Sequence, residues 1–171
     1  MKDTTVRKRL FADENHNLWI LLRQVNQAVN RLREQELMNK NITPEQAEAL
    51  FCIKVIGKNV TPSKLARCII KQPHSTSALI DRMTEKGLVI KNKELPSKNM
   101  VHIKITEKGE AAFSSAGTDD LTSVIFQNLD ENEKHQLRKI LEKLRDTAFA
   151  ELGLNDRPIG PPPLGKMVDE S

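Results

Sequence analysis

The hydrophobic residues of the first part of the chain recur at the spacing of a helix. From Ala12 to Met38 the apolar positions follow one another every three or four residues, as on one face of an amphipathic helix: Leu18, Leu22, Val25, Val29 and Leu32. Such a helix is about 40 Å long at 1.5 Å per residue, more than a small domain needs. Core packing is one interpretation of this face, and the length favours a dimer interface instead.

Two shorter helices follow, and each begins at a Thr-Pro pair. Thr43 can cap the first of them, Gln46 completes a capping box, and the helix ends near Gly57. The same signal opens a second helix from Thr61 to Ile70. We expect this helix to bury Leu65, Ala66, Ile69 and Ile70.

A proline separates that helix from the next one. Pro73 disfavours helical geometry in the residue before it, so the next helix is expected to begin at His74 or Ser75. It runs to Lys86, and Gly87 stands where a left-handed cap is needed. Its inward-facing residues are predicted to be Leu79, Ile80 and Met83.

Residues 91–106, KNKELPSKNMVHIKIT, have the pattern of a β-hairpin. Polar and apolar residues alternate on both sides of a turn-forming cluster at residues 95–99. The segment carries one acid, Glu94, against four lysines: Lys91, Lys93, Lys98 and Lys104. These lysines are explained if a polyanion lies against the hairpin.

Two further helical segments complete the pattern. Thr106 caps a helix that continues to Leu129, with a possible bend or interruption between residues 117 and 120. Asp130 and Glu133 form a capping box for the last helix. One face of that helix carries Leu137, Leu141, Leu144 and Ala148.

This order of elements predicts a mainly α fold with a small β-hairpin wing, a winged helix-turn-helix flanked by long N- and C-terminal dimerisation helices. The expected parts are an N-terminal dimerisation helix (1–40), a winged DNA-binding region (41–106), C-terminal dimerisation helices (107–152) and a Pro/Gly-rich tail (153–171). For the tail, a frayed end is favoured over a strap that packs on a partner subunit through Ile159 and Leu164.

Charge is unevenly distributed along the chain. The net charge is +4, but residues 57–104 hold ten Lys and Arg against three acids, a local charge of +7. A basic middle part is the expected footprint of a nucleic-acid-binding face, although charge alone does not separate it from an uneven solvated surface. No segment has the length of apolar sequence that a membrane helix needs, so we expect a soluble cytoplasmic protein.

The helix after Pro73 has the residues of a DNA-reading helix. Its N-terminal end is short and polar and could approach base edges in the major groove: His74, Ser75, Thr76 and Ser77. His74 can contact DNA or merely start the helix, and contact is slightly favoured. At the hairpin tip, Lys98 is best placed to reach the minor groove, and Lys91, Lys93 and Lys104 would follow the phosphates.

The stretch STSALIDRMTEKGLV, followed by the hairpin and by HIKITEKGEAAF, resembles the MarR-type winged-helix regulators over residues 11–152. The segments TPEQAEAL and LDENEKHQLRKILEKL extend the resemblance. It implies a homodimer that binds a pseudo-palindromic operator, usually represses, and is released by a small ligand or oxidant. By position, it places Ser75, Thr76, Ser77 and Arg82 on the DNA-contacting helix.

The tip of the hairpin departs from the family pattern. The family usually has an acid followed by paired arginines, and this chain has Ser97, Lys98 and Asn99. Lysine keeps the charge of arginine but lacks the rigid guanidinium fork. The comparison therefore predicts weaker or less selective contacts from Lys98 and Asn99, or a wing that is mobile until DNA arrives.

A candidate effector site lies on the first helix. His16, Trp19 and Arg23 could hold an aromatic acid, with its ring against the indole and its carboxylate on the guanidinium. The alternative, which is commoner, is that Trp19 anchors a core or an interface. Cys52 and Cys68 stand in apolar runs, which favours inert core thiols over redox sensors. No cofactor is expected, and His and Cys spacing indicates no metal site.

Three classes of function remain. The first is a ligand-responsive, sequence-specific DNA-binding regulator with double-stranded DNA, a second copy of itself and a small aromatic effector as partners. The second is a protein-interaction adaptor with the same fold, whose recognition helix should be apolar on its outer side. An enzyme fits worst, because the sequence has no catalytic triad, phosphate-binding glycine loop or His-Glu metal pattern.

Overall fold

The computed structural model describes residues 12–92, 101–117 and 121–154. The elements follow in chain order: α2 (Glu14–Leu37), the 3-10 helix η1 (Met38–Lys40), α3 (Pro44–Ile56), α4 (Pro62–Cys68), α5 (Pro73–Glu85), β1 (Val89–Asn92), β2 (His102–Ile105), α6 (Glu107–Ala116), α7 (Leu121–Phe126) and α8 (Glu131–Glu151). The two strands pair antiparallel, from Val89 opposite Ile105 to Asn92 opposite His102. The prediction of a mainly helical fold with a small hairpin is confirmed.

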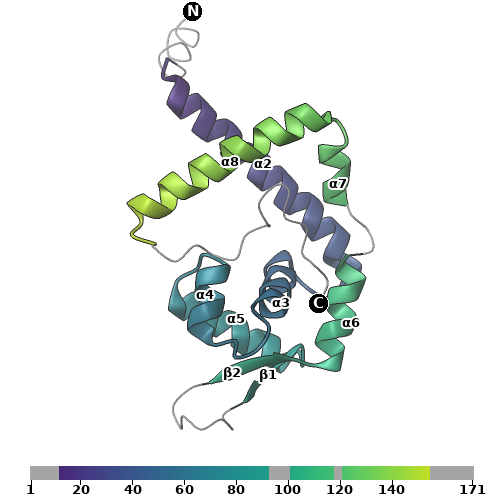
Figure 1. Ribbon diagram of the computed structural model, residues 1–171. Coiled ribbons are helices and arrows are strands. Elements are labelled where there is room, and N and C mark those ends of the chain that lie inside the picture. Colours follow the sequence, from purple (N-terminus) through teal and green to yellow (C-terminus); the bar gives the residue numbers. More distant parts are fainter. Residues whose placement is uncertain (1–11, 93–100, 118–120, 155–171) are drawn as a thin grey trace, which may run out of the picture.

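The molecule has two parts (Figure 1). Helices α2, α7 and α8 lie at one end, and helices α3 to α5 with the hairpin lie at the other. Helix α6 joins the parts, because it packs on α3 and β2 while α7, which follows it, packs on α2. The hairpin also packs against α5, which places a wing beside the second helix of a helix-turn-helix.

The helix starts are those that the capping residues predict. The Gln46 amide nitrogen donates to the Thr43 hydroxyl at 3.2 Å, and the Thr43 amide donates to Gln46 Oε1 at 3.1 Å. The same reciprocal pair joins Asp130 and Glu133, at 2.8 and 2.9 Å. Both predicted capping boxes are confirmed, and each satisfies two amides that a helix start leaves without partners.

The turn between α4 and α5 differs from the prediction at two residues. Helix α4 ends at Cys68, and Ile70 has a left-handed backbone (φ 53°) with 54% of its surface exposed, so its predicted burial was wrong. The Lys71 amide closes the helix end by donating to the Ala66 carbonyl at 2.9 Å. Pro73 is the first residue of α5, where its fixed φ suits a helix start, so α5 begins before His74.

The core is aliphatic and lies under α5. Leu79, Ile80 and Met83 are at most 1% exposed, as predicted, and pack with residues of α3, α4 and the hairpin. Cys52 and Cys68 are free thiols within the same cluster, which confirms their predicted burial. Burial raises the pKa of the Cys52 thiol, and its hydrogen bond with Cys68 adds to the shift.

Thr106 fixes the base of the hairpin to α6. Its hydroxyl donates to the Gly87 carbonyl at 2.6 Å and accepts from the Gly109 amide at 3.0 Å, which makes it the predicted helix cap. Gly87 has the predicted left-handed backbone, with φ of 70°. The start of α6 therefore sets where the two strands leave the core.

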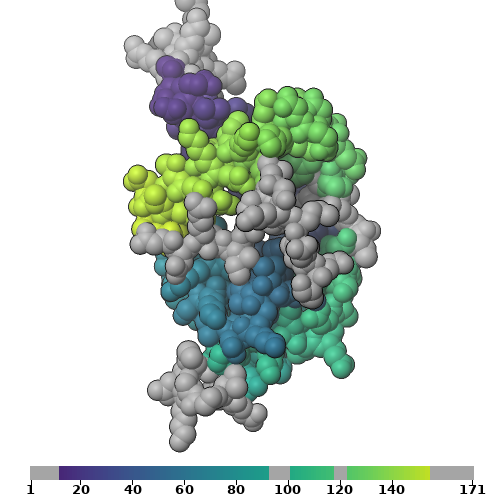
Figure 2. Space-filling model, viewed as in Figure 1, coloured from purple at the N-terminus to yellow at the C-terminus, as the bar shows by residue number. Residues whose placement is uncertain are grey.

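Apolar side chains remain on the surface of the other part. Figure 2 shows α2 and α8 at the upper end of the molecule. On α2 the exposed residues are Leu18, Trp19, Leu21, Leu22 and Val25, and on α7 and α8 they are Val124, Phe126, Ile140, Leu141 and Leu144. On the face that the sequence pattern predicts for α2, Leu18, Leu22 and Val25 are thus exposed, whereas Val29 and Leu32 are half-buried. Within that part, no helix is both long and apolar enough to cross a membrane.

Gly109 allows α6 to approach the hairpin, and this contact gives a test of the fold. A Cβ atom there would lie 2.1 Å from the Leu88 carbonyl oxygen and 2.7 Å from Ile105 Cγ2. Alanine normally favours a helix over glycine, but overpacking at this contact should make Gly109→Ala destabilising by about 1–3 kcal/mol.

Urea unfolding followed by circular dichroism measures the effect, and Gly117 supplies the control. A Cβ on Gly117 would lie 3.8 Å from its nearest contact, the Ser114 carbonyl oxygen. Gly117→Ala should stay within about 0.5 kcal/mol of the parent chain. An unchanged or raised stability of Gly109→Ala would contradict the close approach.

Candidate functional site

The outer face of α5 is polar and accessible. His74, Ser77, Ala78, Asp81 and Arg82 are exposed, and Ser75 is half-buried at the first turn. The Ser77 hydroxyl donates to the Pro73 carbonyl at 3.1 Å, so it points along the helix surface. This face lies on the helix that the hairpin flanks, as a DNA-reading helix requires.

Thr76, which the sequence predicts to contact bases, does not belong to that exposed face. Its side chain is fully buried, and its hydroxyl donates to the Gln72 carbonyl at 3.1 Å. Thr76 precedes Leu79 by three residues and Ile80 by four, so the helical period turns it toward the core. Thr76 helps to seat α5.

Two charged side chains of α5 form ion pairs with neighbouring elements. Asp81 pairs with Lys91 on β1, which ties the hairpin to the helix. Arg82 donates from Nη2 to Glu45 Oε2 on α3 at 3.1 Å. The other oxygen of Glu45 accepts from Lys71 Nζ at 2.6 Å. Glu45 therefore joins α3, the turn before α5, and α5 itself.

The basic middle of the sequence is partly engaged within the protein. Lys86 donates to the Asn41 carbonyl at 3.1 Å and to Gln46 Oε1 at 3.3 Å. Lys104 on β2 is exposed. Three predicted contact residues lie outside the described part of the chain: Lys93, Lys98 and Asn99. The charge count alone overstates how many cations are available to a partner.

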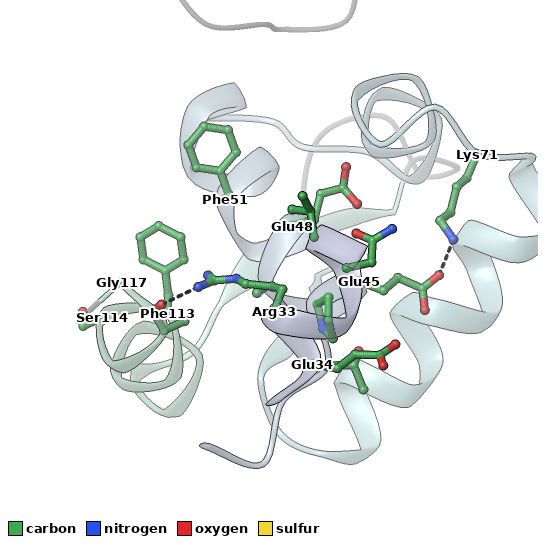
Figure 3. Close-up of a pocket in the computed structure, with 15 residues that line it drawn as sticks. Arg33, Glu34, Glu45, Glu48, Phe51, Lys71, Phe113, Ser114 and Gly117 are labelled. Atoms are coloured by element: carbon green, nitrogen blue, oxygen red, sulfur yellow. Dashed lines mark hydrogen bonds and ion pairs between the residues drawn. The ribbon is translucent and has the colours of Figure 1, made fainter. Parts of the chain in front are cut away.

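A cavity of about 1040 Å³ lies between the two parts of the molecule (Figure 3). Its walls come from the second half of α2, the start of α3, the end of α6, and Lys71. Phe51 and Phe113 stand on one side of the view and Lys71 and Glu45 on the other, with Glu48 between them. Aromatic and charged groups thus share one space of a size that suits a small ligand.

The charged groups of the cavity have distinct surroundings. Arg33 Nη1 donates to Glu36 Oε1 at 2.5 Å and to the Ala116 carbonyl at 3.1 Å, and the Glu36 side chain is only 1% exposed. Arg33 thus ties the end of α6 to α2.

Glu48 has different surroundings. The protein around its carboxyl raises the pKa by desolvation, while Lys71 opposes this shift and Glu45 adds to it.

The predicted effector residues lie together but apart from this cavity. The His16 ring stacks on Trp19 with 5.6 Å between ring centroids, and the Arg23 guanidinium lies 5.6 Å from the Trp19 ring. All three side chains are exposed. The cavity lining on α2 begins at Val29, about 9 Å along the helix from Arg23. A ligand on the Trp19 indole therefore stays a prediction.

Sequence reasoning missed several residues of the site. Asp81 has a signal in its helical spacing, because it lies four residues after Ser77 on the exposed face of α5. Glu45 and Phe113 have no such signal, since their importance comes from contacts across the fold. Within the described residues, no group of three or more His, Cys, Asp or Glu is placed to hold a metal ion.

Solved structures of transcriptional regulators share this fold. The chain is 32% identical to the organohalide-sensing RdhR-CbdbA1625 transcriptional regulator in its 2,4-dichlorophenol-bound form, over 87% of this chain and 89% of that one, with a TM-score of 0.79. It is 26% identical to a cysteine-to-serine mutant of MarR from E. coli complexed with operator DNA, over 78% and 97% of the two chains, with a TM-score of 0.72.

Wild-type MarR from E. coli in its apo form is 27% identical, over 74% of this chain and 96% of that one, with a TM-score of 0.61. No family model and no curated protein matches the sequence. The structural matches, which span nearly the full length of the regulators, are therefore what relates this chain to known proteins.

The buried position of Thr76 leads to a test that separates packing from base contact. Thr76→Ser removes one buried methyl group and keeps the hydroxyl, so it should destabilise the protein by about 1 kcal/mol. Relative affinities for different DNA sequences should not change. Urea unfolding and selection from a random DNA pool measure the two effects.

Ser77→Ala is the matched comparison, since Ser77 is exposed on the same turn region. It should leave stability nearly unchanged and alter DNA binding. A Thr76→Ser variant with full stability and a changed preferred sequence would restore Thr76 to the reading face.

Proposed function

Because this chain belongs to the MarR family of winged helix-turn-helix transcriptional regulators, we propose that it binds a pseudo-palindromic operator as a homodimer, represses transcription there, and is released by a small aromatic ligand. Its general function, a DNA-binding transcriptional regulator, is that of its structural neighbours. The observation that carries the proposal is the polar outer face of α5 beside a hairpin that Lys91 joins to it.

DNA contact is proposed through α5 and the hairpin. The exposed start of α5 would place His74, Ser75 and Ser77 at base edges in the major groove. Arg82 and Lys104 would contact phosphates, together with the hairpin lysines. The ion pair between Asp81 and Lys91 supports this arrangement, because it holds the wing and the reading helix in one orientation.

The homodimer is supported by the apolar surface of α2, α7 and α8. An exposed apolar face of this extent is typical of a surface that another subunit covers. A two-fold dimer would place two α5 helices about 34 Å apart, one turn of DNA. A change in the angle between the dimer helices and the winged part would then move both reading helices out of register.

The cavity is the proposed effector site. It lies between α2 of the dimerisation part and α3 of the winged part, where a bound ligand would change their relative position. The 2,4-dichlorophenol-bound regulator supports an aromatic effector for this chain. The exposed cluster of His16, Trp19 and Arg23 is the alternative place, although its rings already contact one another.

The outer face of α5 favours this function over an adaptor. An adaptor should present apolar residues on that helix, and the exposed residues are instead polar or small, from His74 to Arg82. The structural neighbours are regulators, which points to a protein that is not an enzyme.

The direct test is a gel-shift titration of the full chain against the DNA that flanks its own gene, across salt concentrations. Specific binding at about nanomolar protein, lost steeply at higher salt, is the expected result. If neither this DNA nor selection from a random pool gives a preferred site, the adaptor replaces the regulator as the best interpretation.

A lysine of the hairpin tests the phosphate contacts. Lys104→Ala should weaken binding to operator and random DNA by the same factor and reduce the slope of log K against log salt by about 0.9, the loss of one phosphate contact. Fluorescence anisotropy across a salt series measures both quantities. Lys143→Ala, an exposed lysine of α8, is the control and should leave the slope unchanged. A loss confined to the operator would point to base reading by Lys104 instead.

The dimer interface is tested at Val25, an exposed apolar residue of α2. Val25→Glu should convert the dimer to single chains of 19.4 kDa and abolish specific DNA binding, because an unpaired carboxylate in an apolar interface is strongly unfavourable. Light scattering after size-exclusion chromatography gives the mass. Gln27→Glu adds the same charge on the opposite side of α2 and should leave the dimer intact. A dimeric Val25→Glu would place the interface elsewhere.

A further inference from the structure

The two cations that line the cavity are already engaged. Arg33 pairs with the buried Glu36 at 2.5 Å and also donates to the Ala116 carbonyl. Lys71 pairs with Glu45 at 2.6 Å. An anionic ligand would have to displace one of these carboxylates before it could pair with a cation. Binding of a carboxylate or a sulfonate in the cavity is therefore unfavourable, because both lining cations already have anionic partners.

Carboxylates, in contrast, are available in the same space. Among the described residues, neither Glu34 nor Glu48 of the lining forms an ion pair. Glu48 lines the cavity from an exposed position on α3, and the protein around its carboxyl raises the pKa although Lys71 opposes the shift. A ligand group that donates a hydrogen bond to this carboxylate would supply what desolvation removes, and a positive charge would supply more.

The other side of the cavity suits an aromatic body. Phe51 and Phe113 face the space, with Val29 and Ala47 among the remaining lining residues (Figure 3). The Phe113 ring already makes a cation–π contact, since Lys54 Nζ lies 5.1 Å from its centroid. Lys54 is itself paired with Glu110 at 2.5 Å, so it offers no free charge to an anion.

We propose that the cavity selects a small aromatic compound whose polar end donates a hydrogen bond to Glu48 and competes with Lys71 and Arg82 for Glu45, a protonated amine in preference to an alcohol or a phenol, and any of these in preference to a carboxylate. Only the regulatory consequence of this inference, the weakening of DNA binding by the ligand, rests on the proposed function. The ligand class itself follows from the charges and rings that line the cavity.

Glu45 connects ligand binding to the reading helix. Its two oxygens hold Lys71 and Arg82, and Arg82 belongs to the exposed face of α5. A donor group that binds Glu45 competes with both cations and loosens the contact between α3 and α5. Glu45 is therefore a positioning residue, through which an occupied cavity changes how Arg82 and α5 are held.

Three probes of nearly equal shape test the ligand class: 2-phenylethylamine, 2-phenylethanol and phenylacetate. Isothermal titration calorimetry on the full chain at pH 7 should rank them in that order, with the amine about tenfold or more tighter than the acid, since charged hydrogen bonds contribute that much. Phenylacetate binding as tightly as the amine would overturn the proposal, and so would the failure of all three probes to bind at millimolar concentration.

Variants of the cavity locate the contact. Glu48→Gln should weaken the amine about tenfold and leave phenylacetate unaffected or slightly tighter. Glu151→Gln, an exposed carboxylate at the end of α8, is the matched control and should change neither. Equal amine binding by Glu48→Gln and the parent chain, with the same melting temperature, would remove Glu48 from the site. Amine binding should also weaken as pH falls and Glu48 takes up a proton.

DNA release tests the role of Glu45 and separates the two proposals. Saturating 2-phenylethylamine should weaken binding to the preferred duplex of the parent chain, and Glu45→Gln should reduce this effect about fivefold. An undiminished effect would overturn the role of Glu45. If the chain has no preferred DNA but still ranks the probes as expected, the regulatory function fails and the ligand class stands. If the chain binds a preferred DNA sequence but does not rank the probes as expected, the ligand class fails and the regulatory function stands.

Discussion

Helix α5 must bury one face completely and leave the other free, and the winged region is organised around this constraint. Thr76, Leu79 and Met83 are fully buried on the inner face, while His74 and Asp81 remain on the outer face. Close packing of the inner face fixes the rotation of the helix, since a turn of one residue would bring a polar side chain into an aliphatic core. Two contacts help to fix the position of α5. The left-handed residue Ile70 turns the chain into the helix, and Gly109 lets α6 approach the hairpin that packs on it.

The outer face is held by weaker forces. Exposed ion pairs such as Arg82 with Glu45 contribute about 0–1 kcal/mol each, because water screens them and long side chains lose freedom. The phosphates of DNA present a much denser array of negative charge and can compete for the same cations. Asp81 and Glu45 therefore position Lys91 and Arg82, and both cations can still exchange these partners for DNA phosphates.

Local signals in the sequence account for most of the fold and for part of the site. The capping boxes at Thr43 and Asp130 are complete within four residues, so they could be found without knowledge of tertiary contacts. The short polar side chain of Thr76 is typical of a DNA-contacting helix, but the helical period places Thr76 inward with Leu79 and Ile80. Ile70 could not have been found, since a left-handed residue is normally signalled by glycine. Glu45 is 37 residues from Arg82, and only the packing of α3 on the winged helices brings them together.

The position of the cavity would let weak contacts carry the proposed regulatory effect. It borders Arg33, which ties α6 to α2, and Glu45, which ties α3 to α5. Loss of one exposed ion pair shifts an equilibrium between two arrangements by only a few-fold. A ligand that also fills the space between α2 and α3 adds its own differential binding energy to that shift. Because both subunits of the proposed dimer must keep their α5 helices in register with one DNA turn, a small change at each cavity acts twice on the same complex.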